Sequence, residues 1–119
     1  MSTPETLEEV FEPGGVLTRR LPQFENRPSQ LQMARAVLSA IRERYHLCIE
    51  AGTGTGKTLA YLIPAVFSQK RAIISTATKN LQEQLFQKDI PFIREHVFAG
   101  IRATYMKGRQ NYICLKRLE

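Results

Sequence analysis

A glycine-rich stretch near the middle of the chain combines the residue types that can hold phosphate groups. It reads Ala51-Gly52-Thr53-Gly54-Thr55-Gly56-Lys57-Thr58. Glycine lets the backbone approach a ligand closely, so that consecutive N–H groups can converge on phosphate oxygens. The spacing matches that of a phosphate-binding loop, or P-loop, with alanine in place of its first glycine. We therefore predict a nucleoside triphosphate site at residues 51–58.

Lys57 and Thr58 would carry the chemistry of this loop, and we predict catalytic roles for both. The Lys57 ammonium group would contact the β- and γ-phosphates, and the Thr58 hydroxyl would bind the Mg²⁺ ion that bridges them. The alternative is a glycine-rich turn with a chance Lys-Thr pair. A predicted strand before the loop and a predicted helix after it favour the phosphate-binding interpretation.

Three short apolar runs predict the strands that would position the loop. They cover residues 45–50, 71–76 and 101–106, and the first two are predicted to be buried. Cys48 lies inside the first run, so we expect it to be a small core residue. Strands that alternate with helices along the chain are typical of an α/β fold, with parallel strands and flanking helices.

Apolar residues at helical spacing predict the intervening helices. An amphipathic helix is expected over roughly 28–44, and a second over residues 57–68. Thr78 is expected to cap a third helix that runs from Lys79 to about Lys88. Pro91 is expected to stop this third helix, because proline cannot donate a backbone hydrogen bond.

The chain has 119 residues and a net charge of +6, and this charge is unevenly distributed. Residues 1–26 read as an irregular acidic leader with five acidic and two basic side chains, whereas the remainder has six acidic and fifteen basic ones. Such a basic body suits a polyanionic partner, although a solvated basic surface is the alternative. Two cysteines, no signal sequence and no long apolar run predict a cytoplasmic protein without a membrane segment.

Four segments together resemble the iron–sulfur helicases of superfamily 2, the XPD/DinG group, and most of all its bacterial DinG/YoaA-like branch. They are Phe24–Gln30, Glu50–Thr58, Ile74–Leu85 and Lys107–Cys114. The resemblance implies a partial P-loop NTPase (RecA-like) domain. It also implies an ATP-dependent DNA helicase that moves 5′ to 3′ along single-stranded DNA.

The resemblance assigns ATP contacts to Arg27, Gln30 and all eight residues of the loop from Ala51 to Thr58. Gln30 would hydrogen-bond to the adenine edge, because an amide offers both a donor and an acceptor. Arg27 would support Gln30, and Phe24 would stack on the base. The alternative is that Gln30 is an ordinary exposed residue in the first turn of its helix.

The resemblance also assigns DNA contacts to the segment that resembles motif Ia, residues 74–85. Thr76, Thr78, Lys79 and Asn80 supply hydroxyl, ammonium and amide groups, which suit phosphodiester oxygens. The alternative is that Thr78 is only the N-cap of a helix.

Cys114 would be a ligand of a [4Fe–4S] cluster in the full-length parent, by the same resemblance. Such a cluster takes four thiolates, and this chain offers one candidate besides Cys48. The resemblance divides the chain into the leader, the N-terminal part of the first helicase domain at 27–106, and the start of an iron–sulfur domain at 107–119.

An expected pair of acidic residues is missing downstream of the loop. No Asp-Glu pair ends an apolar run after Lys57, so the second Mg²⁺ anchor and the base that activates water are absent. We therefore expect an N-terminal fragment of a helicase, with little catalytic competence of its own. The alternatives are another P-loop enzyme, such as a small kinase, and a non-catalytic module that binds nucleotide or DNA.

Overall fold

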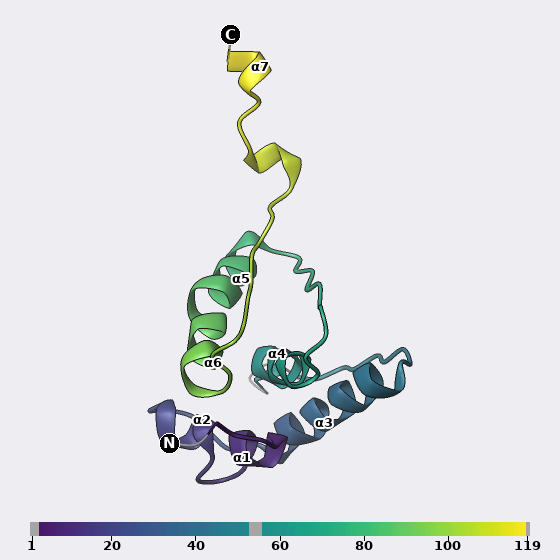
Figure 1. Ribbon diagram of the computed structural model, residues 1–119, viewed down its shortest axis with the longest axis vertical. Helices are drawn as coiled ribbons and strands as arrows, with labels where there is room; N and C mark the ends of the chain where they lie inside the picture. Colours follow the sequence, from purple (N-terminus) through teal and green to yellow (C-terminus); the bar gives the residue numbers. More distant parts are fainter. Residues whose placement is uncertain (1–2, 53–55, 119) are drawn as a thin grey trace.

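The computed structural model describes residues 3–52 and 56–118, and the regular elements within these ranges are all helical (Figure 1). In chain order they are α1 (Leu7–Phe11), α2 (Val16–Arg20), α3 (Pro28–Glu43), α4 (Lys57–Phe67), α5 (Lys79–Gln84), the π-helical turn η1 (Leu85–Asp89), α6 (Ile90–His96), the 3₁₀ turn η2 (Arg109–Asn111) and α7 (Leu115–Leu118). None of these helices has the length and apolar character needed to cross a bilayer.

The two longest helices, α3 and α4, form as predicted and pack against each other (Figure 1). Pro28 occupies the first turn of α3, where its missing N–H costs nothing. Arg44 ends α3 in the left-handed conformation, with φ of 60°. The loop between residues 45 and 56 therefore connects the end of α3 to the start of α4.

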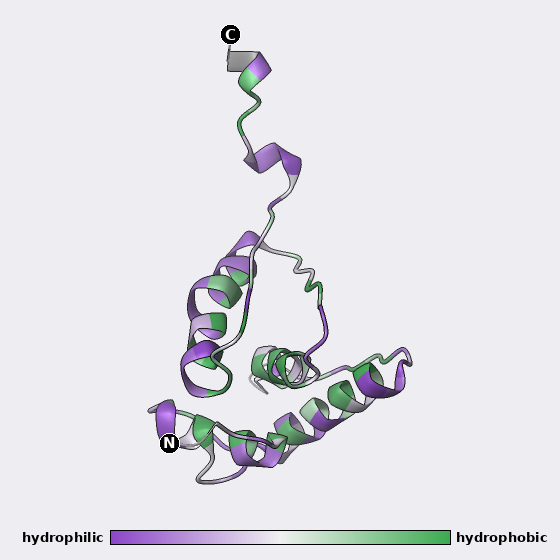
Figure 2. Cartoon of the chain, in the orientation of Figure 1, coloured by the Kyte–Doolittle hydropathy of each residue, from purple (hydrophilic) through white to green (hydrophobic). Residues whose placement is uncertain are grey.

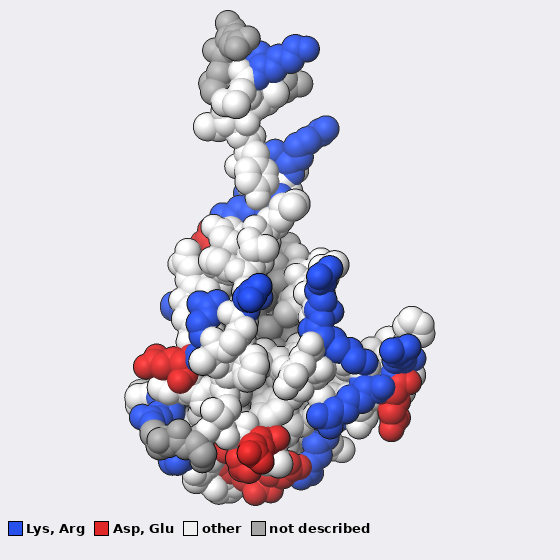
Figure 3. Space-filling view, viewed as in Figure 1, with Lys and Arg blue, Asp and Glu red and all other residues white. Residues whose placement is uncertain are grey.

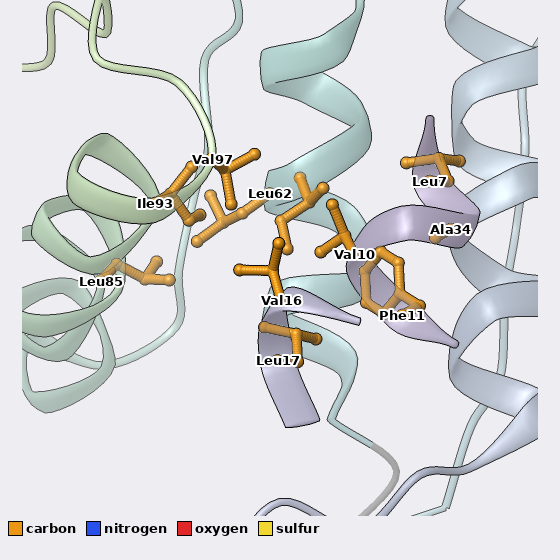
Figure 4. Packing of buried hydrophobic residues seen from close by; sticks show 11 residues of the cluster. Leu7, Val10, Phe11, Val16, Leu17, Ala34, Leu62, Leu85, Ile93 and Val97 are labelled. Atoms are coloured by element: carbon orange, nitrogen blue, oxygen red, sulfur yellow. The ribbon is translucent and has the colours of Figure 1, made fainter. Parts of the chain in front are cut away.

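The leader, which the sequence predicts to be irregular, contributes two short helices to the hydrophobic core. Thr6 caps α1 by accepting a hydrogen bond from the N–H of Glu9 at 3.3 Å. Phe11 of α1 and Leu17 of α2 are almost completely buried. Figure 4 shows them on one side of Leu62 of α4, with Ile93 of α6 on the other side. The leader thereby joins α4 and α6 in one core.

The predicted parallel strands are wrong for the part of the chain that the structure describes. Residues 45–50, 71–76 and 101–106 are irregular there, so the α/β fold class is wrong as well. A strand obtains its hydrogen bonds from a neighbouring strand, and an apolar run alone supplies none. Residues of the second and third segments, among them Ile74 and Ile101, line one pocket of about 520 Å³.

Apolar side chains of these segments remain exposed as a result. Ile73 is 96% exposed and Met106 is 81% exposed, whereas strands of a parallel sheet would bury such residues. Figure 2 shows hydrophobic residues on the irregular connection between α4 and α5. Cys48 is also exposed and is not the core residue that the sequence suggests.

The third predicted helix begins where expected but continues beyond Pro91. Thr78 caps α5 by accepting a hydrogen bond from the N–H of Leu81 at 3.2 Å, which confirms the predicted cap. The π-helical turn η1 then leads directly into α6, and Pro91 lies in the first turn of α6. Proline is tolerated there, so it does not stop the helix at this position.

Gly15 joins α1 to α2 at a point where the backbones approach closely, and this predicts the effect of a substitution. A Cβ atom at this position would lie 2.7 Å from the carbonyl oxygen of Glu9 and 2.9 Å from those of Val10 and Glu12. We expect Gly15→Ala to lower the free energy of unfolding by about 1–3 kcal/mol, because the backbone must shift. Urea denaturation followed by circular dichroism measures this change.

Gly108→Ala is the matched control for this prediction. A Cβ atom at Gly108 would have its nearest neighbours at 3.7 Å, and the φ of Gly108 is −58°, which alanine adopts without strain. Equal denaturation midpoints for the two variants would contradict the proposed role of Gly15.

Candidate nucleotide site and neighbouring polar surfaces

The described residues of the glycine-rich loop are Ala51, Gly52 and Gly56, followed by α4. Thr53, Gly54 and Thr55, three of the predicted ATP contacts, lie outside the described residues. Gly56 is the N-cap of α4 and adopts φ of 72° and ψ of 38°. This left-handed conformation favours glycine, and it places the end of the loop directly before the first turn of α4.

Gln30 of α3 holds the end of the loop in place. Its Nε2 atom donates a hydrogen bond to the Gly56 carbonyl oxygen at 3.1 Å. The Gln30 residue is only 3% exposed, and it is the buried polar residue of the described core. A Cβ atom at Gly56 would collide with Gln30 Nε2, so the contact also requires glycine at that position. The structure thus contradicts the alternative of an ordinary exposed glutamine.

A pocket opens beside this contact. Its volume is about 800 Å³, and its lining includes Phe24, Arg27, Gln30 and Gly56. The pocket is therefore lined by three of the predicted ATP contacts and by the aromatic ring that is expected to stack on the base. Arg27 forms an ion pair with Glu25 at 2.6 Å, and its side chain remains 44% exposed.

Lys57 and Thr58 form the first turn of α4, next to the loop. The Lys57 ammonium group donates a hydrogen bond to the Ala51 carbonyl oxygen at 3.1 Å, which spans the loop from one end to the other. Lys57 itself is exposed, whereas Thr58 is partly buried. The positive end of the α4 dipole lies at this turn and favours a negatively charged ligand.

Two polar residues near the start of α4 have no counterpart in the sequence motifs: Tyr61, which hydrogen-bonds to Thr58, and Asp89, whose charge acts on Tyr61. Burial raises the pKa of Tyr61, its hydrogen bond to Thr58 lowers it, and the negative charge of Asp89 raises it further. Burial also raises the pKa of Asp89, and a hydrogen bond from Gln84 to its carboxylate lowers that pKa by a smaller amount. Only the position of Tyr61, three residues after Thr58 and therefore on the same face of a helix, could have revealed this neighbourhood.

The predicted DNA contacts lie together around the start of α5, on a surface separate from the pocket lining. Thr76 donates a hydrogen bond from its hydroxyl to the Thr78 carbonyl oxygen at 3.1 Å, which shapes the turn. Thr78, Lys79 and Asn80 are exposed. A cap and a ligand contact are compatible at Thr78, because the start of a helix has several N–H groups without intrahelical partners.

The two cysteines do not form a metal centre in the described part of the chain. Cys48 and Cys114 are both exposed and free, and no group of three or more His, Cys, Asp or Glu residues gathers among the described residues. A four-thiolate cluster therefore does not fit the residues present, and Cys114 can supply one ligand at most.

Comparisons with known proteins find helicases among the relatives of this chain. Residues 27–113 match the DEAD/DEAH box helicase family. The ATP-dependent DNA helicase YoaA of Haemophilus influenzae is 45% identical over all of this chain and 19% of its own length. YoaA of Escherichia coli is 48% identical over 95% of this chain and 18% of its own length.

A more distant relative is named for another activity. The 3′-5′ exonuclease DinG of Bacillus subtilis is 38% identical over 93% of this chain and 13% of its own length. The chain thus spans about a fifth or less of the length of these relatives. No solved structure matches it. The family match covers most of the chain, including the loop and the residues around Gln30, and the chain therefore belongs to the DEAD/DEAH box helicase family.

Proposed function

We propose that this chain binds ATP and single-stranded DNA within a helicase that moves 5′ to 3′. The observation that supports this most strongly is the pocket that Phe24, Arg27, Gln30 and Gly56 line at the end of the glycine-rich loop. It offers an aromatic ring, a cation and an amide beside a backbone that can hold phosphates. This combination suits a nucleotide better than it suits a metal ion or a purely apolar ligand.

Gln30 would recognise the adenine base. Its Nε2 atom already donates to Gly56, so the amide oxygen is the atom that would accept a hydrogen bond from the exocyclic amine of adenine. The Phe24 ring would stack on the base, and Arg27 would exchange its exposed partner Glu25 for the nucleotide. Base recognition and the position of the loop would then depend on the same side chain.

The triphosphate would lie along the loop from Ala51 to Thr58. Lys57 presently donates to a neutral carbonyl oxygen of Ala51. A phosphate oxygen is the stronger acceptor because it is charged, so ATP would draw the Lys57 ammonium group away from Ala51. The Thr58 hydroxyl would hold the Mg²⁺ ion that accompanies ATP, and the hydroxyl of Tyr61 would keep Thr58 oriented.

Single-stranded DNA would contact the turn before α5 through Thr76, Thr78, Lys79 and Asn80. These residues are hydrogen-bonding or cationic groups, and the last three are exposed. Such groups hold phosphodiester oxygens without reading the base sequence. The proposed DNA surface and the ATP pocket are thus built from different elements, as a motor that couples the two ligands requires.

Lys57→Ala should abolish ATP binding, because it removes the full positive charge that faces the phosphates. The fluorescence of an ATP analogue labelled on the ribose reports binding to the chain. Lys70→Ala is the matched control: Lys70 is exposed beyond the other end of α4, where it donates to the Ile41 carbonyl oxygen at 3.3 Å. Unchanged affinity in Lys57→Ala would refute the phosphate site.

Gln30→Ala should reduce the preference for ATP over inosine triphosphate by about three- to tenfold, because one hydrogen bond to the adenine amine is lost. Competition of the two nucleotides against the labelled analogue measures this preference. Gln32→Ala is the control, since Gln32 is an exposed residue of the same helix. Equal preferences in Gln30→Ala and the unsubstituted chain would show that Gln30 positions the loop without contacting adenine.

A further inference from the structure

The first part of the C-terminal strap, residues 101–112, runs along α5 and η1 and is held there by side chains, whereas the part with η2 extends beyond α5 (Figure 1). Gln82 Nε2 donates to the Met106 carbonyl oxygen at 2.8 Å, and Lys107 Nζ forms an ion pair with Glu83 Oε1 at 2.8 Å. The rings of Phe86 and Tyr105 are in contact, with 4.4 Å between their centroids. The strap therefore has a defined place, as far as Lys107, on the helix that begins at the proposed DNA contacts.

Two tyrosines of the C-terminal strap remain open to solvent although their positions are fixed. Tyr112 is 56% exposed, and its hydroxyl oxygen accepts a hydrogen bond from the Lys107 N–H at 2.8 Å. Tyr105 is 43% exposed, and the Lys107 ammonium group lies 5.9 Å from its ring centroid. A ring that is already held in place loses little conformational entropy when a flat ligand stacks on it.

The charges around these rings suit an anionic ligand. The C-terminal strap contains Arg102, Lys107 and Arg109 and no acidic residue, and Figure 3 shows basic side chains along this part of the molecule. Lys79 and Lys107 flank the same carboxylate, Glu83, and both cations lower its pKa. A phosphate that approaches Lys79 would therefore also meet Lys107 on the strap.

We infer that Tyr112, with Tyr105 and Lys107, forms a stacking surface for the bases of a single-stranded nucleic acid. Cationic groups that follow the backbone, combined with exposed aromatic rings, are the usual composition of such sites. The inference rests on the proposed DNA contacts at Thr76–Asn80 and extends them across α5 onto the C-terminal strap. In this arrangement Lys79 and Lys107 hold phosphates, and Tyr112 holds a base.

Binding of two oligonucleotides to the full chain tests the stacking role. One is a thymidine oligonucleotide, and the other is an abasic strand of the same length and charge. Tyr112→Ala should weaken binding of the thymidine strand by about 5- to 100-fold, the usual effect of losing one stacked base, and should leave the abasic strand unaffected. Tyr112→Phe should keep most of the difference in affinity between the thymidine strand and the abasic strand, because phenylalanine retains the aromatic ring.

Lys107→Gln should weaken binding of both strands to the same extent. It should also reduce the magnitude of the slope of log affinity against log salt concentration by about 0.7. Tyr45→Ala is the matched control, since Tyr45 is 47% exposed but follows α3, away from the strap. If Tyr112→Ala leaves the ratio of the two affinities unchanged while Lys79→Gln still weakens binding of both strands, the stacking inference is overturned. The proposed DNA surface would then stand. If Lys79→Gln and Lys107→Gln both leave binding intact, the proposed DNA surface fails as well.

Discussion

The packing of α3 against α4 is the constraint on which the rest of the structure depends. These two helices hold Gln30 and Gly56 at hydrogen-bonding distance, and the contact fixes the point where the glycine-rich loop enters α4. Ala34 of α3 and Ile63 of α4 are completely buried, so the pair is held by apolar contact as well as by the amide. Burial of that kind is the main source of stability in a small domain.

The leader has a larger structural role than its composition suggests. Prolines and glycines interrupt it, yet Val10, Phe11 and Leu17 are among its most buried residues. An ion pair of 2.7 Å between Glu8 and Arg35 adds a polar link from α1 to α3. Sequence periodicity could not reveal these helices, because a segment of five residues is too short to show a repeat and depends on tertiary contacts to form.

The sequence predicted local structure well and long-range pairing poorly. Helix α3, helix α4 and the Thr78 cap follow from patterns within a few residues, and all three are present. The three strands required partners distant in sequence, and their apolar side chains, such as Ile73, are exposed instead. Within the candidate site, spacing alone predicts roles for Lys57 and Thr58, whereas the contact of Tyr61 with Thr58 and the charge of Asp89 near Tyr61 depend on packing that no motif records.

The central claim is that the residues around the glycine-rich loop bind ATP for a motor that acts on DNA. The most direct test is the rate of ATP hydrolysis by the full-length protein, with and without single-stranded DNA. The account predicts that DNA stimulates hydrolysis and that no small-molecule acceptor does so. Stimulation by a small acceptor would indicate a kinase, and ATP binding without hydrolysis under either condition would indicate a binding module; both results would contradict the account.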